Sequence, residues 1–178
     1  MKTSIETERL VLREITFADK EDLFQLHTDP EVQKYTGEPV VETMEEIEEA
    51  IRVRHFDYAT YGYGRMATIL KETNEFIGWA GLTYLPEFDK VDLGYRFKKE
   101  YWGKGYATEA SEAILHHGFR VLNLDLIIAI AMPDNKASFK IMEKVGMHFD
   151  KQAPYDETIQ DAIWYRLDRT DYVEKAAT

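Results

Sequence analysis

The segment from Val91 to Met132 constrains the fold more than any other part of the chain. A short stretch, VDLGYRF, is followed by a turn with two glycines, by an amphipathic segment and by the apolar run LDLIIAIAM. An apolar run without interruption is typical of a strand that is buried on both faces of a sheet. Strand, helix and buried strand in this order predict a βαβ unit with two parallel strands.

Further strand and helix patterns lie on both sides of this unit. TERLVLREI, the hairpin of RMATIL and FIGWAGLTYL, and the C-terminal TIQDAIWYRLD are typical of strands. Helices are expected over TFADKEDLFQLH, from Thr43 to about Tyr58 with a capping box at Thr43 and Glu46, and over DNKASFKIMEKV with Gly146 as its stop. The 178 residues show no linker or repeat, so we predict one mixed α/β domain over 1–178, with its core at about 7–172.

The absence of cysteine excludes disulfides, thiolate metal sites and a cysteine nucleophile, and it is compatible with a reducing compartment. The N-terminal MKTSIETERLVLREI lacks the apolar run of a secretory signal. No apolar run is long enough to cross a bilayer. We therefore expect a cytoplasmic protein without a membrane partner.

Acidic residues outnumber basic ones by 33 to 22, which gives a formal net charge of −11. Such a surface repels the phosphates of nucleic acids, so no nucleic-acid partner is expected. It could attract a cationic substrate such as an amine or a basic peptide. The simpler interpretation is that the charge serves solubility alone, and the sequence leaves both open.

The turn YWGKGYATEA places Gly103 and Gly105 directly before a helix. The first N–H groups of a helix are unpaired and partly positive, so a glycine turn at that position can bind phosphate. The turn is neither a P-loop, because Gly105 follows the lysine, nor the dinucleotide fingerprint with three spaced glycines. On the glycines alone, a purely structural turn is the better interpretation. The helix is expected to dock on the sheet through Ala107, Ala110, Ile114 and Val121.

Motifs in a fixed order along most of the chain make the interpretation more specific. They are TERLVLRE, TDPEVQKY, FIGWAGL, LGYRF, YWGKGYATEA, NKASFKIMEKVGM and DAIWYRLDRTDY, from about Thr7 to Tyr172. On these motifs the chain resembles the GNAT superfamily of acyl-CoA-dependent N-acetyltransferases, and within it the RimJ/RimL-like branch, which includes enzymes that acetylate ribosomal protein N-termini. The family's pyrophosphate loop reads Gln or Arg, two residues, Gly, one residue, then Gly or Ala. Gly105 and Ala107 match it, whereas Trp102 replaces the Gln or Arg.

The resemblance implies a central, splayed, mostly antiparallel sheet flanked by helices, with acetyl-CoA in an opening between two strands. The pantetheine is expected along the strand near Gly94–Phe97, where backbone groups would pair with its amides as in strand addition. Acetyl-CoA is the expected acyl donor, and no metal is expected. The residues that the resemblance assigns to acetyl-CoA are Tyr95, Arg96, Phe97, Trp102, Gly103, Lys104, Gly105, Tyr106, Ala107, Thr108, Asn135 and Ser138.

Acyl transfer needs a group that collects a proton from the amine, because a lysine amine (pKa about 10.4) or an α-amine (about 8) is largely protonated near neutral pH. Asp92 is the candidate base, acting through water, at a position where the family often has an acidic residue. A solvent-facing strand carboxylate explains it equally well. Ser138 is the candidate O–H donor to the departing thiolate, although a small residue in a first helical turn needs no such role. Many family members have a tyrosine acid one turn later, where this chain has Met142.

Other aromatic and histidine residues give weaker signals. The five histidines are isolated or, at His116 and His117, point in different directions on one helix, so we predict no metal site. Trp79, Tyr84 and Tyr95 are candidates for an acceptor pocket, although aromatic residues in strands more often belong to the core.

Together these observations predict an enzyme that transfers an acetyl group from acetyl-CoA directly to a primary amine. The acceptor is predicted to be a protein N-terminus such as that of a ribosomal protein, with a polyamine or an amino-bearing antibiotic as alternatives. An acyl-CoA-binding regulatory module without catalysis is a second class, which Met142 and Trp102 leave open. The sequence does not decide between a monomer and a homodimer.

Overall fold

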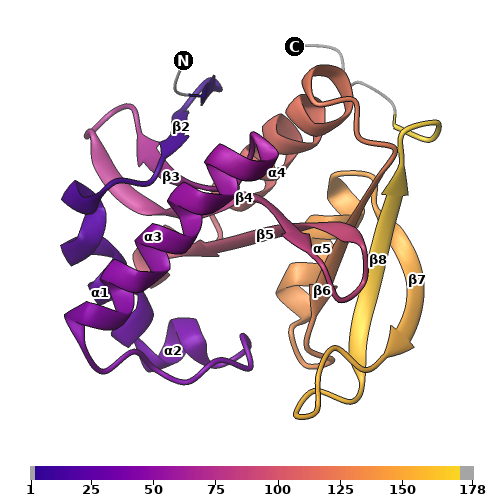
Figure 1. Cartoon of the computed structure of the whole chain (residues 1–178). Coiled ribbons are helices and arrows are strands. Elements are labelled where there is room, and N and C mark those ends of the chain that lie inside the picture. The colour runs from indigo at the N-terminus through magenta and orange to yellow at the C-terminus, as the bar shows by residue number, and fades with distance from the viewer. Residues whose placement is uncertain (1–2, 173–178) are drawn as a thin grey trace.

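The computed structural model describes residues 3–172 (Figure 1). Residues 1–2 and 173–178, the two ends of the predicted domain, lie outside this part. The strands are β1 (Ser4–Glu6), β2 (Leu10–Glu14), β3 (Arg65–Leu70), β4 (Glu75–Leu85), β5 (Lys90–Phe97), β6 (Leu126–Ala131), β7 (His148–Ala153) and β8 (Ala162–Asp168). The helices are α1 (Lys20–Thr28), α2 (Pro30–Gln33), α3 (Met44–Tyr61), α4 (Tyr106–His116) and α5 (Lys136–Lys144), with 3₁₀ turns at Phe17–Asp19 and Lys99–Tyr101 and a π-helical turn at His117–Val121.

The strands form one open sheet in the order β1-β2-β3-β4-β5-β6-β8-β7. Every neighbouring pair is antiparallel except β5 and β6, which are parallel and connected through α4. This confirms the predicted mixed α/β fold, the mostly antiparallel sheet and the βαβ unit. β1 and β7 were not predicted, because β1 is very short and β7 is a largely exposed edge strand without an apolar pattern.

Side-chain and glycine caps set the ends of the helices. Thr43 Oγ1 accepts from the Glu46 N–H, and the Glu46 carboxylate accepts from the Thr43 N–H, so the predicted capping box is confirmed. α3 runs through Tyr61, beyond the predicted end, and stops at Gly62, whose φ is 78°. Gly146, with φ of 92°, follows α5 as predicted.

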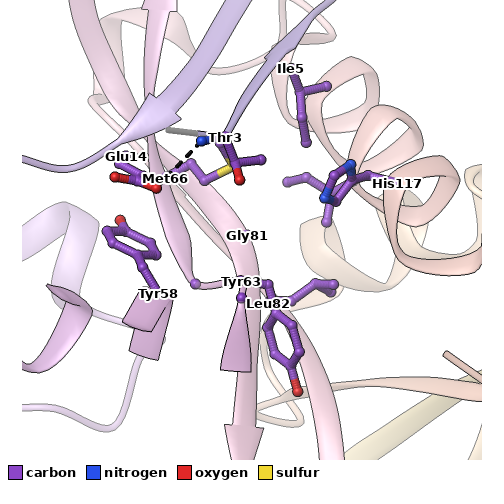
Figure 2. Close-up of a pocket in the computed structure, with 12 residues that line it drawn as sticks. Thr3, Ile5, Glu14, Tyr58, Tyr63, Met66, Gly81, Leu82 and His117 are labelled. Atoms are coloured by element: carbon purple, nitrogen blue, oxygen red, sulfur yellow. Dashed lines mark hydrogen bonds between the residues drawn. The ribbon is translucent and has the colours of Figure 1, made fainter. Parts of the chain in front are cut away.

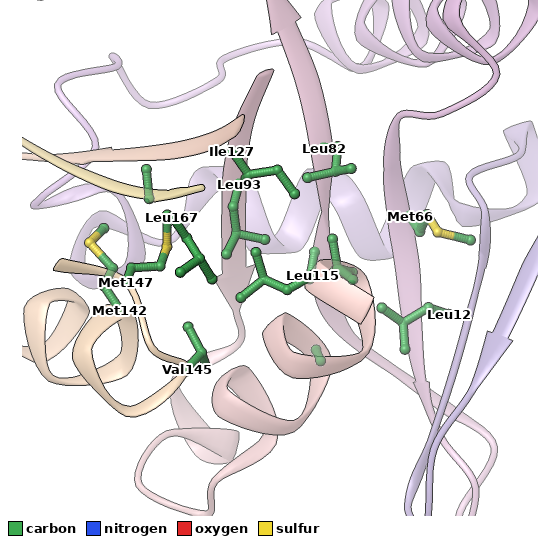
Figure 3. Packing of buried hydrophobic residues seen from close by; sticks show 14 of the residues in the cluster. Leu12, Met66, Leu82, Leu93, Leu115, Ile127, Met142, Val145, Met147 and Leu167 are labelled. Atoms are coloured by element: carbon green, nitrogen blue, oxygen red, sulfur yellow. The ribbon is translucent and has the colours of Figure 1, made fainter. Parts of the chain in front are cut away.

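Apolar side chains are buried on both faces of the sheet. α4 and α5 pack on one face, and α1 and α3 pack on the other. Part of the larger cluster is shown in Figure 3, where Leu115 of α4 lies between the strand residues Leu93 and Leu12, and Met142 of α5 lies near Met147. Two separate helical layers therefore leave the central strands, including β5, buried between them.

The buried face of α4 ends earlier than predicted. Ala110 and Ile114 are 0% and 2% exposed, as expected, but Val121 is 58% exposed. α4 ends at His116, and the chain continues as a π-helical turn with wider spacing, which rotates Val121 away from the sheet. The prediction for Val121 assumed an unbroken α-helix and is wrong.

β5 and β6 diverge next to the position at which they pair. Within residues 3–172 they are paired at one position, Asp92 with Ile128, whereas β4 pairs with β5 over eight positions and β6 pairs with β8 over six. Beyond Asp92, the edge of β5 therefore carries backbone groups that β6 does not pair, as expected for a splayed sheet. We call the opening between β5 and β6 the fork.

Candidate active site

The glycine turn after β5 leads into α4, and no side chain of residues 3–172 caps the first turn of this helix. Gly103 and Gly105 have φ of 72° and 82°, in the left-handed region that favours glycine, and Gly105 is the N-cap of α4. Within the described part of the chain, the backbone N–H groups of residues 103–108 make no hydrogen bond. A row of free N–H groups at a helix N-terminus is suited to an anion, so these residues fit the pyrophosphate of CoA.

Arg9, just before β2, places a cation beside this turn. Its Nη1 donates to the Lys104 carbonyl oxygen at 3.0 Å, and its Nε pairs with the Glu109 carboxylate at 2.6 Å. Its Nη2 lies 3.4 Å from the position that a Cβ on Gly105 would take. This contact joins residues that are 95 positions apart in the chain, and it was not predicted from the sequence. Glu109 offsets the charge of Arg9, and the guanidinium of Arg9 places N–H donors beside the expected phosphates.

The predicted CoA residue Trp102 lies at the outer side of the turn. It is 46% exposed, and its Nε1 donates to the Phe97 carbonyl oxygen at 2.8 Å. Lys104 extends over the ring of Tyr101, with its Nζ 5.3 Å from the ring centroid. Neither side chain bonds to the free N–H groups, so the replacement of Gln or Arg by Trp102 leaves the turn open to an anion.

Asp92 is the β5 residue at which the fork opens. It is only 8% exposed, and its Oδ1 has no hydrogen-bond partner in the described residues. Burial raises the pKa of Asp92 to about 6, against the opposing effects of the Arg65 charge and the Ile130 N–H. Such a carboxyl is mostly ionised at neutral pH and can still take up a proton. Asp92 is therefore buried rather than solvent-facing, which fits a base.

Ser138 and Tyr95 meet on the other face of β5. Ser138, in the first turn of α5, is 7% exposed, and its Oγ lies 2.7 Å from the Tyr95 hydroxyl oxygen. Asn135 caps α5 by accepting from the Ser138 N–H at 3.1 Å. Tyr95 is three residues from Asp92 along the strand, so the two side chains point to opposite faces. Met142, where the family often has tyrosine, belongs to the core cluster.

Charged side chains gather around Trp79 on the Asp92 face. The guanidinium carbons of Arg65 and Arg96 lie 4.4 and 5.2 Å from the centroid of the Trp79 ring. Arg96 pairs with Glu38 at 2.9 Å and lies 3.1 Å from Nδ1 of His27. Burial, assisted by the Arg96 charge, lowers the pKa of His27 to about 4, so this imidazole is neutral at pH 7.

A small cleft opens beside this group. Trp79, one of the aromatic candidates, lines it, whereas Tyr84 hydrogen-bonds to Asp89 at 2.8 Å near the β4–β5 turn. Arg65 was not expected from the sequence to contribute here. The cleft is lined by Ile15, Leu23, His27, Ile47, Ala50, Ile51, Arg54, Arg65 and Trp79.

Figure 2 shows a separate small pocket, where the ends of α3 and α4 approach β3 and β4. Tyr58 and His117 lie on opposite sides of it. Its lining residues are Thr3, Ile5, Glu14, Tyr58, Gly62, Tyr63, Gly64, Met66, Gly81, Leu82, Ile114 and His117. Because it includes neither the glycine turn nor Asp92, Tyr95 or Ser138, it is not part of the candidate active site.

Two observations bear on other kinds of site. Among residues 3–172, no group of three or more His, Asp or Glu side chains is placed to hold a metal ion. None of the helices in the same range combines the length and the apolar character that a bilayer crossing requires. His55 instead bonds through Nε2 to the Ile15 carbonyl oxygen at 2.9 Å.

Comparison with known proteins gives consistent matches. The model of the acetyltransferase (GNAT) domain matches residues 9–148. The uncharacterized N-acetyltransferase YoaA of Bacillus subtilis is 31% identical over 172 residues, covering 89% of this chain and 96% of YoaA. The structure of an acetyltransferase from Agrobacterium tumefaciens has a TM-score of 0.81 at 27% identity, covering 93% of this chain and 94% of that one.

Two further solved structures are similar at lower identity. A spermidine N-acetyltransferase from Vibrio cholerae, in complex with CoA and spermine, has a TM-score of 0.77 at 20% identity, covering 93% of this chain and 99% of that one. A ribosomal-protein-S5-alanine acetyltransferase from Vibrio fischeri has a TM-score of 0.79 at 20% identity, covering 96% and 99%. At such identities the likeness shows the shared fold alone.

Proposed function

The chain belongs to the GNAT family of acetyl-CoA-dependent N-acetyltransferases, and on this premise we propose that it acetylates a primary amine at the fork between β5 and β6. The pyrophosphate of acetyl-CoA would bind the N–H groups of residues 103–108, and the pantetheine would run along the free edge of β5. The amine would enter on the face of β5 that carries Asp92. It would attack the thioester directly, so that the acetyl group passes from sulfur to nitrogen.

The position of Asp92 carries this proposal. The amine must give up a proton as its nitrogen bonds to the carbonyl carbon, and a buried carboxyl with a pKa of about 6 can receive it, directly or through water. The carbonyl oxygen becomes an oxyanion, for which unpaired N–H groups on the edge of β5 are suitable donors. The C–S bond then breaks, and CoA leaves as a thiolate.

Ser138 and Tyr95 are proposed to assist the departing thiolate. Their hydroxyl groups share a hydrogen bond on the face of β5 opposite Asp92. Burial raises the pKa of Tyr95 above its usual range, so its hydroxyl stays protonated and remains a donor. The pair would supply the O–H group that Met142, in place of the family's tyrosine, does not supply.

Ser138→Ala and Tyr95→Phe are each expected to lower kcat by up to about 10²-fold, the low end for loss of acid assistance. The acetyl-CoA KM is expected to change little, because the hydroxyl acts mainly in the transition state. If the hydroxyls act as one unit, the double variant will lose little more than the worse single variant. Steady-state thiol release on folded variants measures this, and unchanged kcat with rate-limiting chemistry would remove the pair from the mechanism.

The identity of the acceptor is the finer part of the proposal. Resemblance to the RimJ/RimL-like branch supports a protein N-terminus such as that of a ribosomal protein, and one structural neighbour is named for that activity. Another neighbour is named for spermidine. The face that holds Arg54, Arg65 and Arg96 also holds the carboxylates of Asp57, Glu38 and Asp92, so its charge does not decide between these acceptors. We also propose that the protein is cytoplasmic, because a ribosomal protein acceptor would be found there.

Release of CoA thiol in the presence of an amine panel tests the proposed function. The panel holds a peptide with a ribosomal-protein N-terminus, spermidine, an aminoglycoside and free amino acids. We expect thiol release above the amine-free background with at least one of them, matched by acetylated amine in mass spectrometry. Binding of acetyl-CoA without release for any amine would contradict the proposal and support a non-catalytic acyl-CoA-binding module.

A further inference from the structure

We propose that Arg65 binds a carboxylate on the acceptor, so that the substrate is a small amine with a carboxylate close to its amino group, such as a free α-amino acid. This inference rests on the proposed function and names the substrate class of the same site. It also rests on the ion pairs of the charged groups on the Asp92 face, because some of these groups have an ion-pair partner and Arg65 has none within the described part of the chain.

Two of the three arginines on this face are paired with carboxylates. Arg54 pairs with Asp57 at 3.1 Å, and Arg96 pairs with Glu38 at 2.9 Å. Within residues 3–172, the Arg65 guanidinium forms neither an ion pair nor a hydrogen bond, and its Nε is buried without a partner. Burying an unpaired charge is costly, so Arg65 is the group on this face that gains most from an incoming anion.

The Arg65 guanidinium is held in place by the ring of Trp79, 4.4 Å away. Arginine that stacks on an aromatic face keeps its N–H groups available for bidentate contact with a carboxylate. Burial lowers the pKa of Arg65 to about 10, so the side chain is still charged at neutral pH. It is therefore a rigid, charged and unpaired donor in the cleft.

Asp92 Oδ2 and Arg65 Nε both lie near the side-chain position of Gly94. A Cβ on Gly94 would lie 3.6 Å from Asp92 Oδ2, 3.7 Å from Arg65 Nε and 3.4 Å from the Trp79 ring. The carboxylate and guanidinium atoms are therefore at most about 7.3 Å apart, although they form no ion pair with each other. A ligand that lies between these two atoms and bonds to both, at about 2.9 Å each, has its amino and carboxylate groups within a few ångström. That spacing favours attachment to the same or the neighbouring carbon.

The α2–α3 loop limits the size of the acceptor. A Cβ on Gly37 would overlap Ile159 of the β7–β8 loop and lie 3.8 Å from Met132 at the end of β6. The next residue, Glu38, is tied to Arg96 of β5. The loop thus reaches across the fork from β5 to the second half of the sheet, which favours a free amino acid over the protein N-terminus that the resemblance alone suggests.

The test compares acceptors that differ only in the carboxylate. Each proteinogenic L-amino acid is assayed for thiol release, and each active one is compared with its α-carboxamide and its decarboxylated amine. We expect the acid to exceed both analogues in kcat/KM by about 10–100-fold, the worth of a charged hydrogen bond. Equal rates for acid and carboxamide would overturn the inference. Acetylation of spermidine or of the peptide alone would also overturn it, but would leave the proposed function standing, whereas no release with any amine would overturn both.

Three variants and one control test the residues. Arg65→Met removes the charge and keeps the stem on Trp79, so the KM of the acid should rise by about 10–100-fold, with no preference left over the carboxamide. Arg65→Lys should restore part of the preference for the acid over the carboxamide. Acetyl-CoA binding should be unchanged in both Arg65 variants. Gly94→Ala, whose methyl group would meet only ordinary contacts of 3.4 Å or more, should fold and raise the acceptor KM. Arg52→Gln, on the exposed side of α3, is the charge-matched control. If Arg65→Met still prefers the acid over the carboxamide, the inference is contradicted. If Arg65→Met does not fold, the comparison of acid, carboxamide and amine on the wild-type chain still tests the inference.

Discussion

Asp92→Asn is expected to lower kcat/KM for acetyl transfer by about 10²–10⁴-fold, the usual loss when a general base is removed. Asparagine keeps the size of the side chain but cannot accept the proton of the amine. For the wild type, kcat/KM should rise with pH through about 6, where Asp92 ionises, and the variant should lack this rise. The measurement is thiol release from pH 5 to 9 with one acceptor. Ionisation of the acceptor's own amine adds a second step to the pH profile, and this step is the same for the wild type and the variant.

The step near pH 6 can be assigned because the neighbours of Asp92 ionise elsewhere. Its charged and titratable neighbours are Arg65 on β3, Tyr95 on β5 and Tyr155 between β7 and β8. Burial lowers the pKa of Arg65 only to about 10 and raises the pKa of both tyrosines above their usual value of 10.0. None of them changes charge around pH 6, so a wild-type step that persists in Asp92→Asn would exclude Asp92 as the base.

Stability separates a catalytic loss from a structural one. Because the native pKa of Asp92 lies above its unfolded value, its contribution to stability is present below about pH 4 and is lost as the pH rises through about 6. At neutral pH, ionisation of Asp92 therefore costs up to about 3 kcal/mol. Asp92→Asn should keep or raise the Tm at pH 7, and a large fall in Tm would contradict the catalytic interpretation of lost activity.

Gly105→Val is expected to weaken acetyl-CoA binding by about 100-fold. A valine side chain would stand beside the free N–H groups where a phosphate oxygen must approach. With ligand at 100 times the wild-type Kd, stabilisation by acetyl-CoA should fall from about 2.7 to about 0.4 kcal/mol, as measured by the shift in Tm. If the variant keeps the full shift, the turn is not the phosphate site.

A matched glycine controls for backbone strain. Gly105 has φ of 82°, so valine costs about 1–2 kcal/mol there even without ligand. Gly146 has φ of 92° after α5, and a Cβ there would meet nothing within 4 Å. Gly146→Val should therefore lower the Tm similarly but keep the full shift on adding acetyl-CoA.

Much of the fold could be predicted from the sequence because its strongest signals are local. The apolar run of β6, the capping box at Thr43 and the glycines before α4 each depend on neighbouring residues. β7 could not be predicted, because an exposed edge strand is specified by its partner β8 rather than by its own pattern. The π-helical turn that displaces Val121 likewise has no distinct pattern in the sequence.

The candidate site could be predicted only where one residue's chemistry, or the resemblance, identified it. Asp92 and Ser138 were proposed in that way, and both are buried, Asp92 on β5 and Ser138 in the first turn of α5. Contacts between distant segments could not be predicted in this way. Examples are the contact of Tyr95 with Ser138, 43 residues apart, and the contact of Arg9 with the glycine turn. The role proposed for Arg65 depends on its having no ion-pair partner within residues 3–172, which is a property of the folded chain.

A crystal structure of the chain with CoA tests the central claim most directly, that the fork is the site of acetyl transfer. We expect pyrophosphate oxygens at about 2.7–3.2 Å from N–H groups of residues 103–108, and the CoA sulfur at the fork near Ser138. CoA in the separate pocket lined by Tyr58 and His117, or bound without contact to the glycine turn, would contradict that claim.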